Sequence, residues 1–309
     1  MKAVGVTGQD SMTRLFDVDE PFAAHDGVVV EVMAASVNDF DREALRGHAT
    51  EAGDQGPVML GRDFVGRVTA VGEDVDYIDV GMHVAGALSP QALGKSGSFA
   101  ERVAVPAGSL APVPAGVDVE HAAGVGLAGV TALDAINALG AARLGQLVIH
   151  GPVSEVGGFA LQLAKAHGAV VAVITAESQV DLAYRLGADF VAVERKTASE
   201  SVEAVRDFFG GGADTAIHVA GDLAVAAGVV RPDGIYTSVD GAAMDAILSG
   251  DGYVPTIVTA SGHKLADLLF KVAGGRLASP VGRTLSFDQI ECAVNLDGGD
   301  INGRTVVVR

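Results

Sequence analysis

Residues 147–165 read Leu-Val-Ile-His-Gly-Pro-Val-Ser-Glu-Val-Gly-Gly-Phe-Ala-Leu-Gln-Leu-Ala-Lys, and this stretch decides the fold. A short apolar run from Leu147 to Ile149 predicts a buried strand, and the apolar residues from Val156 onward recur at helical spacing. Between the two, Gly151 and Pro152 mark a tight turn. Strand, turn and helix in this order form the unit that binds the pyrophosphate of a dinucleotide. The sequence therefore predicts a dinucleotide-binding fold.

Two residues of this turn depart from the usual pattern. A phosphate-binding turn has glycines where the backbone approaches the anion, and Ser154 and Glu155 stand at two such positions. Ser154 can contribute a hydroxyl, whereas the Glu155 carboxylate must point away from a diphosphate or be protonated. Two interpretations stay open: an active cofactor site, and a turn that kept its fold after losing its ligand.

The composition indicates a compact protein with an acidic surface. Of 309 residues, 49% are hydrophobic and 19% are charged, so the chain is long enough for two domains and unlike a disordered chain. The formal net charge of -18 repels nucleic-acid phosphates and anionic lipid. We therefore expect a small-molecule substrate, and neither nucleic acid nor membrane as a partner.

The start of the chain and its single cysteine lead to further expectations. Residues 1–6 predict a first strand and lack the features of a signal peptide, and no apolar run reaches the roughly 18 residues of a membrane-spanning helix. We therefore expect a cytoplasmic protein. The lone Cys292 can form no internal disulfide and is expected to be a small core residue.

Residue patterns divide the chain into two domains of an α/β protein. Residues 1–118 hold short alternating runs broken by Gly and Pro, typical of a partly closed antiparallel β-barrel, and residues 256–309 complete that domain. Residues 119–255 alternate helices with buried strands, which predicts a Rossmann-type, doubly wound parallel sheet. Strands are expected at 147–150, 170–174, 190–193, 215–219, 235–239, 281–285 and 305–308, and a helix at 264–273.

Several spaced motifs occur in a consistent order across nearly the whole chain. They are ASVNDFD at 35–41, PVMLGRDFVGRV at 57–68, VGEDV at 71–75, GSFAE at 97–101, TAL at 131–133, the turn quoted above, and LGAD at 186–189. With these motifs the chain resembles the medium-chain dehydrogenase/reductase superfamily, and within it the zinc-free quinone oxidoreductases. The resemblance implies that the β-barrel is a GroES-like domain.

The resemblance also implies that metal ligands are missing. Asn38 stands where zinc-dependent relatives place a metal-binding cysteine, and Gly61-Arg62-Asp63 replaces their Gly-His-Glu. With one cysteine, the chain also cannot form a thiolate-rich structural zinc site. No zinc is therefore expected.

The implied activity is hydride transfer from a nicotinamide to a quinone or an α,β-unsaturated carbonyl. Such a reaction needs the nicotinamide held against the acceptor, and a group that protonates or polarises the developing anion. The alternative is a cofactor-independent descendant that uses the fold for small-molecule binding, cyclisation or elimination, because the turn is altered at Ser154 and Glu155. Relatives often dimerise through the edge strands of their nucleotide-binding sheets, so a homodimer is expected.

Matching the family's motifs residue by residue suggests three catalytic candidates. Asn38 and Thr131 would lie beside the nicotinamide; their structural alternatives are a turn-stabilising asparagine and a helix-facing threonine. His48 falls near a proton-donating tyrosine of relatives, and an exposed loop histidine is the alternative. His218 replaces an acidic residue, and could face the nicotinamide or be a hydrogen-bonded core histidine.

The same comparison gives the cofactor-binding candidates. They are Gly151, Ser154, Val156 and Gly157 in the turn, Thr175, Ser178 and Arg185 after the next strand, and Val219 after a later strand. Ser178 and Arg185 could bind the 2'-phosphate of NADPH, although Gln179 stands where a relative has lysine. A carboxylate would favour NADH, and Glu177 comes slightly late for that role. The resemblance favours NADPH and leaves NADH open.

Overall fold

The computed structural model describes residues 1–7, 12–45, 57–88, 96–140, 144–194, 198–240, 252–295 and 303–309. The chain divides into two compact units. Unit 1 comprises Met1–Val130, Ala260–Gly298 and Arg304–Arg309, and unit 2 comprises Thr131–Thr259 and Gly299–Gly303. The division falls inside helix α2 (Val119–Leu139), so this helix contributes to both units.

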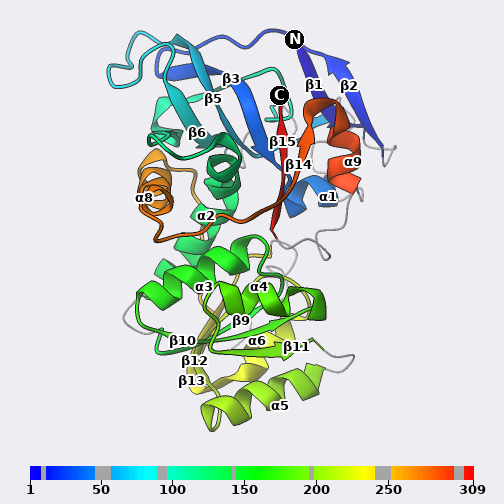
Figure 1. The fold of residues 1–309 in the computed structure, drawn as a ribbon, viewed down its shortest axis with the longest axis vertical. Coiled ribbons are helices and arrows are strands. Elements are labelled where there is room, and N and C mark those ends of the chain that lie inside the picture. Colours follow the sequence, from blue (N-terminus) through cyan, green and yellow to red (C-terminus); the bar gives the residue numbers. More distant parts are fainter. Residues whose placement is uncertain are drawn as a thin grey trace. The chain divides into compact units, whose positions relative to one another are not determined.

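Unit 1 is built on a seven-stranded sheet that joins both ends of the chain (Figure 1). Its strands are β3 (Gly27–Ser36), β5 (Asp63–Val71), β6 (His83–Ala87), β7 (Arg102–Pro106), β8 (Leu110–Pro112), β14 (Val281–Ser286) and β15 (Arg304–Val308). The pairs are antiparallel apart from β14 with β15, which are parallel. Because β15 pairs with β3, the last strand returns to the N-terminal region.

Shorter elements complete unit 1. A second sheet has the order β2–β1–β4, with β1 at Lys2–Val6, β2 at Thr13–Asp17 and β4 at Val58–Met59. The helices, besides the first part of α2, are α1 (Asp39–Leu45), α8 (Gly262–Ala273) and α9 (Ile290–Asn295), with 3-10 turns η3 (Ala107–Ser109) and η7 (Phe287–Gln289). The core between them is rich in valine, which packs well on a pleated, half-buried surface.

Unit 2 contains a five-stranded sheet in which all neighbouring pairs are parallel. Its strands run in the order β11 (Phe190–Val193), β10 (Val170–Thr175), β9 (Gln146–His150), β12 (Ala213–His218) and β13 (Val230–Ser238). The crossovers are α3 (Val156–Ala166), η5 (Glu177–Gln179) with α4 (Val180–Arg185), α5 (Ala198–Phe209) and α6 (Leu223–Val229). Residues 147–149 and 171–174 are fully buried, as expected for strands covered on both faces.

The strand order has a reversal point at β9. From β9 the chain moves outward through β10 and β11, and then returns to place β12 on the other side of β9. Right-handed crossovers put α3 and α4 on one face of the sheet and α5 and α6 on the other, and α5 and α6 contact each other (Figure 1). In sheets of this kind, ligands bind at the carboxyl ends of the strands beside the reversal point.

Two sequence-based expectations need correction. By length and composition, helix α2 is long and apolar enough to cross a membrane. Such a segment was not expected from the sequence, because Gly and Ala residues interrupt the run of large apolar side chains in α2. Since 78% of its most apolar window is buried inside the protein, α2 has the character of a core helix. Cys292 was expected in the core, but it is exposed, because it lies on the solvent side of the short helix α9.

Candidate functional site

The predicted cofactor turn begins with a glycine that the backbone requires. Gly151 has φ +123°, a conformation that side-chain-bearing residues rarely adopt. A Cβ at this position would lie 2.8 Å from the Ala220 amide nitrogen. The Val219 amide also donates to the His150 carbonyl, at 2.8 Å. Gly151 therefore lets the end of β9 pack against the residues that follow β12.

The helix after the turn packs directly against it. A Cβ on Gly157 would lie 2.3 Å from the Pro152 carbonyl oxygen, so close packing requires glycine at this position. Helix α3 begins at Val156, and the first hydrogen bond of its opening turn runs from the Gly158 amide to the Glu155 carbonyl. The amides of Val156 and Gly157 precede that bond, at the end of the helix where the dipole favours an anion.

Gln179 joins the turn from the neighbouring strand. Its side chain is 1% exposed, and its Oε1 accepts a hydrogen bond from the Val153 amide at 2.7 Å. Its Nε2 donates to Ser154 Oγ at 3.3 Å. Gln179 thus points inward to the turn, and not outward like a residue that would reach a 2'-phosphate. Sequence reasoning placed Gln179 at a lysine position but did not foresee this contact, because a side chain's direction at a strand end depends on tertiary packing.

The other cofactor candidates lie around the end of β10 and beyond β12. Thr175 is the last residue of β10, and its buried hydroxyl has no hydrogen-bond partner in the part of the chain that the structure describes. Ser178 is exposed in η5, and Arg185 is exposed at the last position of α4. Val219 is buried directly after β12. The structure therefore brings Gly151 and Val219 together, joins Ser154 to Gln179, and leaves Arg185 exposed on a helix surface.

Two histidines end the strands on either side of the reversal point. His150 ends β9 and His218 ends β12, and their ring centroids are 5.4 Å apart. His218 Nε2 lies 3.2 Å from the Gly221 carbonyl oxygen. Because a carbonyl oxygen can only accept, Nε2 carries the hydrogen of the ring. Nδ1 then accepts a hydrogen bond from Ser238 Oγ, at 2.9 Å. His218 is therefore a neutral, hydrogen-bonded core histidine, and burial lowers its pKa.

His150 has a different environment from His218. Its side chain is fully buried, and neither ring nitrogen makes a hydrogen bond to the described residues. The nearest charge is Glu194 Oε1, 3.6 Å from His150 Nε2. Burial, followed by the proximity of His218, lowers the pKa of His150. Both imidazoles are thus held neutral at the carboxyl end of the sheet.

In unit 1, a buried carboxylate connects the sheet, α2 and the last strand. Asp63 Oδ1 accepts from the Ser36 amide at 3.1 Å and the Ser36 hydroxyl at 2.8 Å, and Oδ2 accepts from the Leu127 amide at 3.2 Å. Arg304 Nη2 lies 3.7 Å from Asp63 Oδ2, and both side chains are fully buried. Burial raises the pKa of Asp63, and the Arg304 charge and these hydrogen bonds oppose that rise.

Asn38 belongs to this buried cluster. Its Oδ1 accepts from Arg304 at 2.9 Å, and its Nδ2 donates to the Ser36 carbonyl at 3.1 Å. Asp41 accepts from the backbone amides of Asn38, at 2.9 Å, and Gly61, at 2.7 Å. Burial raises the pKa of Asp41 to about 6, although both amide hydrogen bonds oppose the rise. The Asn38 amide is thus fixed with its oxygen toward Arg304, and one of its two Nδ2 hydrogens remains for another acceptor.

The two remaining catalytic candidates are placed differently. Thr131 is a buried residue of α2 and the first residue of unit 2. His48 lies outside the residues that the structure describes. The predicted catalytic set is therefore divided between unit 1, which holds Asn38, and unit 2, which holds Thr131.

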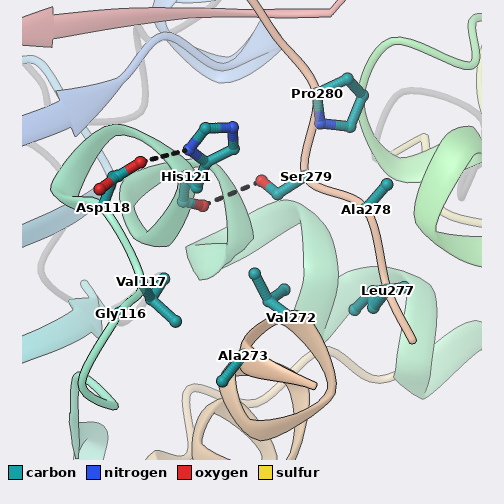
Figure 2. Close-up of a pocket in the computed structure, with 10 residues that line it drawn as sticks. All are labelled: Gly116, Val117, Asp118, His121, Val272, Ala273, Leu277, Ala278, Ser279 and Pro280. Carbon is teal, nitrogen blue, oxygen red and sulfur yellow. Dashed lines mark hydrogen bonds and ion pairs between the residues drawn. The ribbon is translucent and has the colours of Figure 1, made fainter. Parts of the chain in front are cut away.

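A separate pocket of about 360 Å³ lies within unit 1 (Figure 2). The end of α8 and the segment after it form one side, and the residues that lead into α2 form the other. His121 Nδ1 lies 3.6 Å from Asp118 Oδ2, and the Ser279 hydroxyl donates to the His121 carbonyl at 2.9 Å. None of the sequence-predicted site residues lines this pocket. Within the described ranges, no three His, Cys, Asp or Glu side chains gather closely enough to hold a metal ion.

Comparison with known proteins identifies both parts of the chain. Residues 24–115 match the family model of the alcohol dehydrogenase GroES-like domain, and residues 156–274 match that of the zinc-binding dehydrogenases. A mitochondrial NAD(P)H oxidoreductase of Mus musculus is 28% identical, over 91% of this chain and 81% of its own length. A zinc-type alcohol dehydrogenase-like protein of Schizosaccharomyces pombe is 31% identical, over 79% of this chain and 72% of its own.

Two further proteins are similar. An acryloyl-coenzyme A reductase of Sulfurisphaera tokodaii is 30% identical, over 65% of this chain and 66% of its own length. The solved structure of the quinone oxidoreductase from Coxiella burnetii matches with a TM-score of 0.81 and 22% identity, over 100% of this chain and 99% of that one, and it shows the shared fold. The α/β fold with a GroES-like domain and a Rossmann-type domain is thereby confirmed. The chain belongs to the medium-chain dehydrogenase/reductase superfamily.

Proposed function

We propose that this protein is an oxidoreductase that transfers hydride from NAD(P)H to a quinone or an α,β-unsaturated carbonyl, without zinc. The single observation that carries the proposal is the turn after β9. It lies at the reversal point of the sheet, opens with a positive-φ glycine, and leads into the amide end of α3. The names of the mouse and Sulfurisphaera relatives support a nicotinamide-dependent reduction, and the acryloyl group is itself α,β-unsaturated.

The residues at this turn fit a dinucleotide. The amides of Val156 and Gly157 can donate to phosphate oxygens at the positive end of the helix dipole. Thr175 offers a buried hydroxyl without a partner among the described residues, at the strand end that faces the adenosine ribose in this architecture. An unsatisfied buried hydroxyl is costly, so a ligand that bonds to it is favoured.

The proposed catalytic groups follow from the same interpretation. A bound nicotinamide supplies the hydride. In this proposal Asn38 and Thr131 are the catalytic residues, and the remaining Nδ2 hydrogen of Asn38 donates to the oxygen on which charge develops. Arg304 supports this role because it holds the Asn38 oxygen and so keeps the nitrogen as the available donor. His48 is the proposed proton donor.

We propose NADPH as the cofactor, because the family resemblance favours it. NADH is the alternative, and the titration described below distinguishes the two. Ser178 and Arg185 are exposed and are the proposed ligands of the 2'-phosphate. Gln179 is excluded from this role because its side chain is buried in the turn. A preference for NADPH therefore rests on those two residues.

Calorimetric titration with NADPH, and separately with NADH, tests the proposal, on the native protein and on the Glu155→Gly variant. Micromolar binding of either dinucleotide to the native protein supports the reductase, and the tighter one identifies the cofactor. The Glu200→Gly variant provides a control for the same exchange elsewhere in unit 2, since Glu200 is an exposed residue in the first turn of α5. Absence of binding by the native protein, with recovery in Glu155→Gly, would overturn the reductase.

The second candidate is a cofactor-independent descendant that binds a small molecule for a non-redox step. One observation favours it: the Val153 amide, which belongs to the turn, is already occupied by Gln179 Oε1. A turn that satisfies its own amides has less need of a ligand. The titration above separates the two candidates, because this descendant binds neither dinucleotide.

We also propose that the protein acts in the cytoplasm as a homodimer, with no nucleic-acid or membrane partner. The net charge of -18 supports the absence of anionic partners. Strand β13 is the last strand of the five-stranded sheet in unit 2, and Tyr253 forms a parallel bridge to its Tyr236. The proposed dimer edge is therefore formed by residues 235–239 together with the segment after them. Sedimentation analysis of the purified protein tests the dimer.

A further inference from the structure

The turn after β9 lacks two glycines, yet it is held in a defined conformation by one buried amide. Gln179 reaches it from η5, 26 residues away from Val153 in sequence. We infer that Gln179 is a positioning residue that turns the Ser154 hydroxyl into a hydrogen-bond donor for the diphosphate of the cofactor. This inference rests on the proposed function, since it assigns a role in binding that cofactor.

The orientation of the Gln179 amide follows from its partners. The Val153 amide can only donate, so the atom 2.7 Å from it must be the carboxamide oxygen. The carboxamide nitrogen then faces Ser154 Oγ, 3.3 Å away. Because this nitrogen can only donate, Ser154 Oγ accepts.

The direction of this bond determines what Ser154 has left. A hydroxyl has one hydrogen to donate, and here the contact with Gln179 does not use it. Among the described residues, none accepts that hydrogen. A phosphate oxygen is an acceptor without a hydrogen of its own at neutral pH, so it is the complementary partner.

Burial makes the arrangement rigid before any ligand binds. Gln179 is 1% exposed and Ser154 is 5% exposed, so both side chains have already lost their rotamer freedom. A preorganised donor costs less entropy on binding than a mobile one. The hydroxyl and its amide support therefore compensate for the glycines that the turn lacks, and they do so without adding charge beside Glu155.

The test uses a substitution whose chemistry depends on pH. In Gln179→Glu, an ionised carboxylate still accepts from Val153, but its second oxygen now takes the Ser154 hydrogen away from the ligand. A protonated carboxyl restores the native pattern, since its O–H donates to Ser154 as the amide did. We measure the affinity for ADP-ribose, which carries the diphosphate without the nicotinamide, by calorimetry at pH 8 and pH 5.

We expect Gln179→Glu to bind ADP-ribose at least about tenfold more weakly than the native protein at pH 8, because one hydrogen bond to a charged group is lost. At pH 5 the variant should recover most of this affinity. Ser154→Ala should lose about tenfold at both pH values. The double variant Ser154→Ala with Gln179→Glu should show no recovery at pH 5, because the hydroxyl on which the carboxyl acts is missing.

A matched control is Gln289→Glu. Gln289 Oε1 accepts from the Ser286 amide at 3.1 Å and the Ser286 hydroxyl at 3.0 Å, in unit 1, so the exchange alters a similar glutamine contact away from the turn. It should leave ADP-ribose affinity unchanged at both pH values. Thermal melting at pH 8 shows whether each variant is folded. If Gln179→Glu is not folded, the ADP-ribose affinity of Ser154→Ala alone tests the inference.

The outcomes separate this inference from the proposed function. If the native protein binds ADP-ribose but Ser154→Ala or Gln179→Glu binds it equally well at pH 8, the inference fails and the proposed function stands. The inference also fails if the double variant recovers at pH 5 as fully as Gln179→Glu does. If the native protein binds neither ADP-ribose nor a nicotinamide dinucleotide, the proposed function fails, and this inference fails with it.

Discussion

The two units bury different polar groups around their candidate site residues. Unit 1 buries charges: Asp63 lies against Arg304, and Asp41 lies against two backbone amides. Unit 2 buries neutral groups at the carboxyl ends of its strands, namely His150, His218 and Gln179. A buried charge is tolerated only when its neighbours satisfy it, and hydrogen bonds satisfy both carboxylates in unit 1. Arg304 Nε and Nη1, in contrast, have no hydrogen-bond partner among the described residues. A neutral group without a hydrogen bond costs less than an unpaired charge. In unit 2, both ring nitrogens of His150 and the Thr175 hydroxyl have no hydrogen-bond partner among the described residues, so they are available to a ligand.

The largest expected effect tests the buried charged cluster of unit 1. Arg304→Met leaves Asp63 buried without its cation, and we expect a loss of about 3–5 kcal/mol in the free energy of unfolding. Urea unfolding measures the loss. The control is Arg309→Met, which breaks the partly exposed pair of Arg309 with Glu101 and should cost less than about 1 kcal/mol. Equal losses would contradict the distinction between buried and exposed pairs.

The second prediction concerns the pH dependence of unit 1. Burial raises the pKa of folded Asp41 to about 6, above its usual value of 3.8, so the folded state binds the proton more tightly than the unfolded state. This stabilisation is complete below the unfolded pKa and is lost as the pH rises through the folded pKa. The whole contribution of Asp41 is about 3 kcal/mol, at about 1.4 kcal/mol per pKa unit, and about 2 kcal/mol of it should be lost between pH 4 and pH 6.

Comparison of the native protein with Asp41→Asn isolates this contribution. The variant loses the titratable group, so its free energy of unfolding, measured by urea at several pH values, should lack the decrease between pH 4 and pH 6. A native slope identical to that of the variant would show that Asp41 is ionised across this range in the folded protein.

The third prediction concerns the turn of unit 2. Gly151→Ala combines a positive φ with a Cβ 2.8 Å from the Ala220 amide nitrogen, so we expect a loss of about 2–3 kcal/mol. Gly168→Ala also has a positive φ, but no atom lies within 4 Å of its Cβ, and it should cost about 1 kcal/mol. Thermal unfolding compares the two variants. Equal melting temperatures would mean that the turn relaxes to admit the methyl group.

The smallest effect is expected from the neutral histidines. Burial lowers the pKa of folded His150, so the unfolded state takes up the proton first, and stability is lost as the pH falls below about 6.5. This direction is opposite to that of Asp41. His150→Leu should change the stability at pH 7.5 by less than about 1.5 kcal/mol, since no hydrogen bond to a described residue is removed. It should also reduce the loss on acidification.

Hydrogen exchange on peptides from each unit measures the two directions separately. Corrected for intrinsic rates, peptides from β9 and β12 should lose protection between pH 7 and pH 5, and His150→Leu should reduce that loss. Peptides from β3 and β5 should not lose protection over the same range through Asp41. A loss in β9 and β12 that is unchanged in His150→Leu would assign the acid sensitivity to other groups.

Local patterns were sufficient for the elements that periodicity defines. The strands expected at 147–150, 170–174 and 190–193 are β9, β10 and β11, and the helix expected at 264–273 is α8. These predictions are confirmed because a buried parallel strand or an amphipathic helix reveals itself within a few residues. The parallel pairing of β14 with β15 was not foreseen, because pairing partners depend on distant segments.

The candidate site was partly predictable. Gly151 and Gly157 were identified as turn glycines, and the close approaches at both explain why no side chain fits there. The inward direction of Gln179 had no local signal, and neither did the contact of Asn38 with Arg304, which joins residues 266 positions apart. The spacing of apolar residues predicted which segments are strands and which are helices. It could not predict which distant side chains form hydrogen bonds with each other.

By itself, the sequence determined the class of the fold, the strands and helices with regular apolar spacing, and the place of the turn after β9, because each of these depends on short-range spacing of apolar residues and glycines. Tertiary structure alone decided how the altered turn is supported, which imidazoles are neutral, and which cation faces Asp63 and Asn38. The physical reason is that hydrogen-bond direction and burial are properties of neighbours in space, and those neighbours come from distant parts of the chain.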